Sequence, residues 1–200
     1  MARHQEDKKN SIMGETRRKL IEAAAQEFSL QGFNKANVNL IAEQAGFSIG
    51  TLYNYFPTKR ELMFAFITDA SDQHVQFIQE KVLQVELPAH RLEVFFEAGF
   101  AFIEQHITLA KAIFNTLNGP DEEFKLKLFQ AYQPLFQLLG KQIVGEGIAQ
   151  EVFRPVDPMN TANLIMLVYL GVGSQFNREG KLWVQAEQVS EFILNSLLKR

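Results

Sequence analysis

Hydrogen-bond donors are concentrated between residues 48 and 59, where hydroxyls, an amide and an ammonium group recur at short intervals. Side chains of these types contact the phosphates and base edges of DNA. No nucleophile elbow and no triad spacing accompanies them, so their arrangement does not indicate nucleophilic catalysis. The donors expected to reach DNA are Ser48, Thr51, Tyr53, Asn54, Tyr55 and Lys59. We therefore expect a nucleic-acid-binding surface here.

Other kinds of chemistry find little support in the sequence. The chain contains no cysteine, which excludes disulfides, thiolate zinc sites and cysteine nucleophiles. The glycine pairs at 145/147 and 171/173 follow no strand, so they are not dinucleotide loops. The histidines are scattered, without carboxylates at metal-binding spacing: His4, His74, His90 and His106. We expect no enzyme, no cofactor and no metal site.

Three helices must position the donors. The second and third are separated by only a few residues, which is the spacing of a helix-turn-helix. The third helix, from about Ile49 to Phe56, would enter the major groove, with Leu52 and Phe56 on its buried side. The expected boundaries are Gly32 after the first helix, Asn37 as N-cap of the second, Gly46 as its break, Ser48 as N-cap of the third and Pro57 after its end.

The continuous segment from Ile41 to Lys59 resembles the signature of TetR-type (TetR/AcrR-like) transcriptional regulators. The resemblance covers about residues 12–64 and implies an all-α protein, in which a three-helix DNA-binding head precedes a larger ligand-binding and dimerisation body. Upstream residues at matching offsets are Arg17, Ala24, Phe28, Gly32 and Phe33.

The resemblance also implies roles for individual residues. Thr51, Tyr53 and Lys59 would hold phosphates, with Tyr55 beside them. The remaining implied contacts are Ile49, Gly50 and Asn54 at the bases, Asn37 and Ser48 at helix N-termini near the backbone, and Arg17 or Arg18 at a neighbouring phosphate or the minor groove. Two departures stand out. Ala36 and Asn37 replace a hydroxyl pair, and Ile49 offers only apolar contact, for instance with a thymine methyl.

The charge distribution agrees with a DNA-binding head. Residues 1–60 carry nine basic and six acidic side chains, whereas residues 61–200 carry eleven and seventeen. We therefore divide the chain into a DNA-binding domain at 1–60, with a mobile charged arm at 1–10, and a ligand-binding and dimerisation domain at 61–200. No apolar run reaches membrane length and the N-terminus is too polar for a signal peptide, so we expect a cytoplasmic protein without membrane contact.

The body is predicted to be helical throughout, giving about nine helices in total. A Thr58–Glu61 capping box opens a long helix to about Val85, and Asp157–Pro158 opens another to about Phe176. That helix is apolar nearly all round, so it must be buried on all sides. We expect it to pair with the last helix in a homodimer on a palindromic operator. The interface residues would be Leu164, Val168, Gly171, Val172, Trp183, Val189, Phe192 and Ile193.

Phenylalanine is unusually frequent, with 18 residues against one tryptophan. Most must be core, but the resemblance implies a ligand cavity among the body helices. Candidate pocket residues are Phe96, Phe100, Phe114, Phe129 and Tyr169. The leading hypothesis is a repressor released by a small hydrophobic effector of unknown identity. The alternative is a DNA-binding protein with a solid body controlled by a partner protein, and a third is a helical enzyme with a chance motif.

Overall fold

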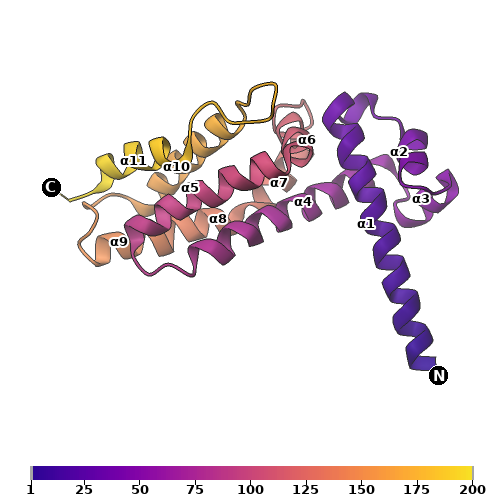
Figure 1. Cartoon of the computed structure of the whole chain (residues 1–200), viewed down its shortest axis with the longest axis horizontal. Helices are drawn as coiled ribbons and strands as arrows, with labels where there is room; N and C mark the ends of the chain where they lie inside the picture. Colours follow the sequence, from indigo (N-terminus) through magenta and orange to yellow (C-terminus); the bar gives the residue numbers. More distant parts are fainter. Residues whose placement is uncertain (1, 200) are drawn as a thin grey trace. The chain divides into compact units, whose positions relative to one another are not determined.

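The computed structural model of the chain describes the backbone of residues 2–199 and the side chains of residues 12–199. Across this range the protein is helical and forms no strand beyond two isolated bridges, which confirms the all-α prediction (Figure 1). The helices are α1 (Ala2–Lys35), α2 (Val38–Gln44), α3 (Ile49–Tyr55), α4 (Lys59–Val82), α5 (Pro88–Gln105), α6 (Ile107–Leu117), α7 (Glu122–Ala131), α8 (Gln133–Gln137), the π-helix η1 (Leu138–Gly145), α9 (Glu146–Ala149), α10 (Pro158–Gly173) and α11 (Ala186–Leu197).

The chain folds as two compact units. The first comprises residues up to 70 together with 111–127, and the second comprises 71–110 with 128 onward. Helix α4 contributes its first half to one unit and its second half to the other. The two units are defined by contacts between residues. The division into two domains at residue 60 is a division by function, and it remains a proposal.

Helix α1 begins at Ala2, so residues 2–10, which were expected to form a mobile arm before the helix, are its first turns. Only the backbone of residues 2–11 is described; Met1 and these side chains, including that of His4, lie outside the described residues. The correction has a local cause, because residues 2–13 contain no proline or glycine to break the helix. The first interruption is Gly32, whose φ of 68° is the left-handed conformation expected there.

Helices α1, α2 and α3 form the expected three-helix unit (Figure 1). The Asn37 side chain accepts a hydrogen bond from the Asn39 amide and begins α2, and Ser48 caps α3 in the same way. Gly46, at φ 80°, makes the turn between them. In the capping box of α4, the Glu61 amide donates to Thr58 Oγ1 and the Thr58 amide donates to the Glu61 carboxylate, both at 3.1 Å. Every predicted cap in this unit is therefore confirmed.

In the second unit, α5 packs against α11 and η1, and α10 packs against η1 and α8. Asp157 caps α10 as predicted, accepting from the Asn160 amide at 2.7 Å. The residues from Glu122 to Ala149 form four short elements in succession, α7, α8, η1 and α9. Pro134, near the start of α8, cannot supply the amide that would continue α7, which explains the break between α7 and α8. Within the described residues, none of the helices combines the length and apolarity needed to span a membrane.

Candidate functional site

The outward face of α3 is built by an N-cap and two buried anchors. Ser48 Oγ accepts from the Thr51 amide at 3.0 Å and lies 2.9 Å from the Thr51 hydroxyl, which fixes the first turn. On the opposite side Leu52 is completely buried and Phe56 is 4% exposed. The polar residues between these anchors must therefore face away from the core.

The burial pattern agrees with this orientation. Tyr53 is 45% exposed and Ile49 is 37% exposed, although both are large side chains that a core would readily take. None of the residues predicted to contact DNA is buried; Thr51, Tyr55 and Lys59 are half-buried and the others are exposed: Arg17, Arg18, Asn37, Ser48, Ile49, Gly50, Tyr53 and Asn54. This surface offers hydroxyl, amide and guanidinium donors together.

Lys59 also makes contacts within the protein that the sequence did not predict. Its ammonium group donates to the carbonyls of Ala36 at 2.7 Å and Asn34 at 3.2 Å, and it lies 5.0 Å from the centre of the Phe33 ring. Burial lowers the pKa of Lys59, and the Glu27 carboxylate partly opposes that shift. Two of its three donor hydrogens are thus used to join the end of α1 to the start of α4, leaving one for a phosphate.

Glu27 is a structural residue that sequence reasoning missed. It is only 4% exposed, and its carboxylate accepts from the backbone amide of Asn37 at 2.9 Å. This bond fixes the residue that caps α2, so Glu27 positions the first helix of the turn. The sequence did contain a sign of this role: Glu27 is an acidic residue within the apolar stripe that contains Ala24 and Phe28, and a charged side chain at a core position is rarely buried unless it is paired.

The two arginines of α1 are placed differently. The Arg17 guanidinium lies 5.6 Å from the centre of the Phe56 ring, next to the end of α3. Arg18 forms an ion pair with Glu22 on the exposed surface of α1. Arg17 is therefore held near the C-terminal end of α3 by a cation–π contact, while Arg18 is held by a neighbour on its own helix.

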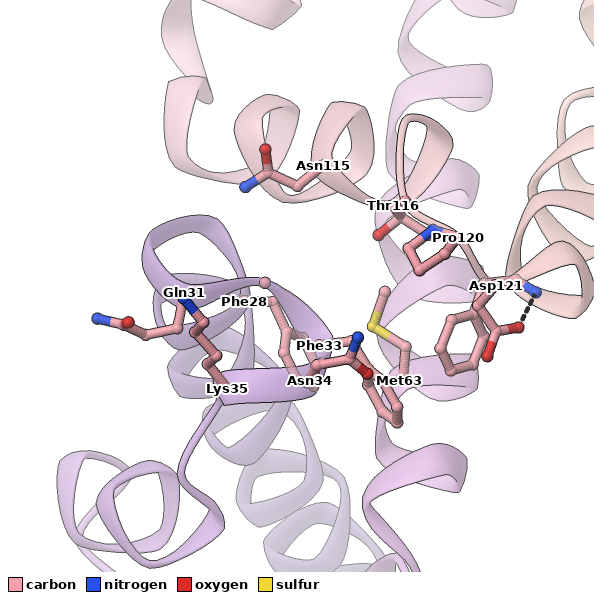
Figure 2. Close-up of a pocket in the computed structure, with 13 residues that line it drawn as sticks. Phe28, Gln31, Phe33, Asn34, Lys35, Met63, Asn115, Thr116, Pro120 and Asp121 are labelled. Carbon is pink, nitrogen blue, oxygen red and sulfur yellow. Dashed lines mark hydrogen bonds between the residues drawn. The ribbon is translucent and has the colours of Figure 1, made fainter.

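A small hollow lies on another side of the first unit (Figure 2). Its volume is about 230 Å³, and the apolar side chains that line it include Phe28, Met63 and Phe124. Asp121 also lines the hollow and caps α7 by accepting a hydrogen bond from the Phe124 amide (Figure 2). Its carboxylate pairs with the Arg60 guanidinium at 3.0 Å. The volume is below the roughly 300–1,000 Å³ of pockets that enclose drug-sized ligands. We do not assign the effector to this hollow.

The predicted pocket residues fall into separate environments. In the second unit, Phe96, Phe100 and Tyr169 are at most 4% exposed and their rings contact one another, with centroids 5.5–6.1 Å apart. Phe129 is 47% exposed in that unit, and Phe114 is a buried residue of the first unit. Phe96, Phe100 and Tyr169 form a packed aromatic cluster, and their role in binding a ligand stays a prediction.

The predicted interface residues also divide by burial. Leu164, Trp183 and Phe192 are 64%, 71% and 73% exposed, Gly171 is exposed, and Val168 and Val172 are half-buried. Val189 and Ile193 are buried within the protomer, where α11 packs against α5. Leu167, which was not among the predicted interface residues, is 65% exposed on α10.

A capped recognition helix with polar outward residues, in a three-helix unit with a tight glycine turn, defines a helix-turn-helix DNA-binding protein. Residues 20–66 match the family model described as bacterial regulatory proteins, tetR family.

Similar proteins agree with this match. The HTH-type transcriptional repressor KstR2 of Mycobacterium tuberculosis is 30% identical over 73% of this chain and 71% of its own. YdgC of Bacillus subtilis, an HTH-type transcriptional regulator, is 33% identical over 57% of this chain, and the match spans 60% of its length. The crystal structure of FadR from Bacillus subtilis in complex with stearoyl-CoA has a TM-score of 0.77 at 20% identity, covering 90% of this chain and 97% of its own. The chain belongs to the tetR family and is a DNA-binding transcriptional regulator.

Proposed function

We propose that the protein represses transcription as a homodimer on a palindromic operator and is released from it by a small hydrophobic effector. The observation that carries the proposal is the outward face of α3, where polar side chains stay exposed while Leu52 and Phe56 are buried. Thr51, Tyr53 and Lys59 contact phosphates, and Asn54 reads base edges. Since its target is the genome of a bacterium, its compartment is the cytoplasm.

The exposed apolar side chains of α10 support the homodimer. Leu164, Leu167, Val168 and Gly171 recur at helical spacing on one face, and the two leucines are about two-thirds exposed. A face of this kind favours burial against another apolar surface. A second copy related by a two-fold axis offers the same face, and a two-fold protein fits a palindromic operator.

The effector class is proposed from the aromatic composition of the second unit and from a structural relative. FadR was crystallised with stearoyl-CoA, and it shares this fold. We propose that an acyl thioester binds this protein, with its hydrocarbon chain among the phenylalanines. An effector that binds the DNA-incompetent conformation more tightly shifts the population away from operator binding.

One observation favours a second candidate function. The close packing of Phe95, Phe96, Phe100 and Tyr169 is what a solid body would show, and such a protein would be controlled by a partner protein. Titration with acyl thioesters separates the two: a body that binds no hydrophobic ligand and leaves operator affinity unchanged supports control by a partner.

The DNA-binding proposal is tested on an operator obtained by selection from random-sequence duplexes. The selected sequence should be a palindrome, and Tyr53→Ala should weaken its binding about tenfold, measured by fluorescence anisotropy. Lys59→Met should reduce the slope of log affinity against log salt by about 0.9 if its remaining donor contacts a phosphate. Lys141→Met, which removes an equal charge from the exposed surface of η1, is the matched control. Unchanged affinity with Tyr53→Ala would refute the assigned contact surface.

A further inference from the structure

Three polar side chains meet inside the aromatic cluster of the second unit. They come from α4, from the turn before α8 and from α10, so the fold alone brings them together. His74 Nδ1 lies 3.0 Å from the Tyr132 hydroxyl, and His74 Nε2 lies 2.8 Å from the Tyr169 hydroxyl. Ser71, one turn before His74, is fully buried, and its hydroxyl interacts with that of Tyr132 without reaching good hydrogen-bonding geometry. We call these four residues the buried donor chain.

The buried donor chain is surrounded by aromatic rings. The His74 imidazole stacks on Phe102 with the ring centres 4.5 Å apart. The Tyr169 ring contacts Phe95 and Phe100, with centroids 5.3 and 5.5 Å away. Its hydroxyl enters a notch at Gly99, where a Cβ atom would come within 2.5 Å of the oxygen. The position of the Tyr169 hydroxyl is thus set by packing on several sides.

The buried donor chain contains more donor hydrogens than its own acceptor atoms can pair with. Desolvation keeps the imidazole neutral by lowering the pKa of His74 to about 3, a shift that a nearby Gly99 carbonyl only partly opposes. A neutral imidazole has one donor and one acceptor nitrogen. One tyrosine therefore donates to His74 while the other accepts from it, and the accepting tyrosine keeps its own hydroxyl hydrogen. That one buried hydroxyl hydrogen lacks an acceptor in the contacts described for these residues, whereas the Ser71 hydroxyl interacts with the hydroxyl of Tyr132.

Unpaired buried donors are costly, and a group that supplies an acceptor removes that cost. The acceptor must be uncharged, because none of the contacts described for the buried donor chain is to a lysine or arginine, and a carboxylate would lose its hydration there without a counter-charge. A carbonyl oxygen meets both requirements.

We propose that the buried donor chain binds the carbonyl oxygen of the effector, and that it selects thioesters, esters and ketones over the same hydrocarbon without a carbonyl. This inference rests on the proposed function, since it names the group by which the effector is recognised. Binding requires the rings around Tyr169 to move, because they fill the space in this structure.

The test uses two ligands that differ only in the carbonyl. Stearoyl-CoA carries it, and S-octadecyl-CoA is the thioether without it. Calorimetry on the full-length protein should show about tenfold tighter binding of stearoyl-CoA, the effect of a good hydrogen bond to a desolvated group. Tyr169→Phe, which keeps the ring in its notch, should bring the two affinities to within about twofold. Phe96→Leu alters the packing without changing any hydrogen bond of the chain, so it should weaken both ligands and preserve their ratio.

The outcomes separate this inference from the proposed function. If stearoyl-CoA binds with the expected ratio but does not release the operator, the release proposal fails and the carbonyl site stands. If both ligands release the operator equally well, or if Tyr169→Phe weakens both by the same factor, the carbonyl site is refuted. Should neither coenzyme A compound bind, 2-octanone and octane give the same comparison through the rise in Tm. Equal rises, or no rise with the ketone, refute the proposal.

Discussion

Acidification should destabilise the protein through His74. The imidazole is buried and its pKa falls from the ordinary 6.5 to about 3, because burial disfavours the charged form. In the unfolded chain the imidazole takes up a proton as the pH falls below about 6.5, while in the folded protein it stays neutral down to about pH 3. The unfolded state therefore binds more protons in this window, and the free energy of unfolding decreases as the pH falls.

The magnitude follows from the two pKa values. Between pH 7 and pH 5 the unfolded imidazole passes from mostly neutral to almost fully protonated, and linkage gives a loss of about 2 kcal/mol. Urea unfolding at pH 7 and pH 5, at one fixed protein concentration, measures the total loss. In His74→Gln, which keeps a donor and an acceptor, the loss should be smaller by about that amount.

The matched control is His90→Gln, which removes an exposed imidazole paired with Glu93 on α5. The pH dependence of its stability should follow the wild type. If His74→Gln folds poorly, the imidazole resonances of His74 in the wild-type protein should show no titration between pH 7 and pH 5. An equal loss of stability in wild type and His74→Gln, or a titration of His74 in that range, would refute the reasoning about a neutral buried imidazole.

Three further perturbations probe other parts of the molecule. Gly99→Ala places a methyl group against the Tyr169 ring and should lower the free energy of unfolding by about 1–3 kcal/mol in urea titrations, so an unchanged midpoint would contradict the notch. Asn37→Ala removes the cap of α2 and should cost about 1 kcal/mol, whereas Asn37→Asp should retain most of it; equal losses would argue against the cap. Phe192→Glu should convert dimers to monomers in sedimentation velocity, while Phe129→Glu, a charge on another exposed phenylalanine, should not.

Helix boundaries were predictable because their hydrogen bonds are local. The caps at Asn37, Ser48 and Asp157 each join a side chain to an amide two or three residues away, so a short stretch of sequence contains both partners. The outward face of α3 followed from the same local pattern, since Leu52 and Phe56 lie one helical turn apart. The continuous motif from Ile41 to Lys59 then indicated the family.

The buried side of a helix was harder to predict where a second surface competes for its apolar residues. Val189, Phe192 and Ile193 read alike in sequence, but α11 packs on α5 and buries the first and third while Phe192 stays exposed. The direction of Lys59 was also decided by tertiary contacts, since the carbonyls that it binds lie 23 and 25 residues earlier. Neither distinction can be made from periodicity alone.

The sequence by itself determined the helical fold, the DNA-binding head and its caps, because these depend on spacing within a few turns. It contained Ser71, His74, Tyr132 and Tyr169 but gave no reason to join them, and it left His74 as one of four scattered histidines. Only the tertiary structure brought together residues as distant as His74 and Tyr169, which are 95 positions apart, and removed them from water. Burial makes their hydrogen bonds and their protonation matter, because water no longer supplies the missing partners.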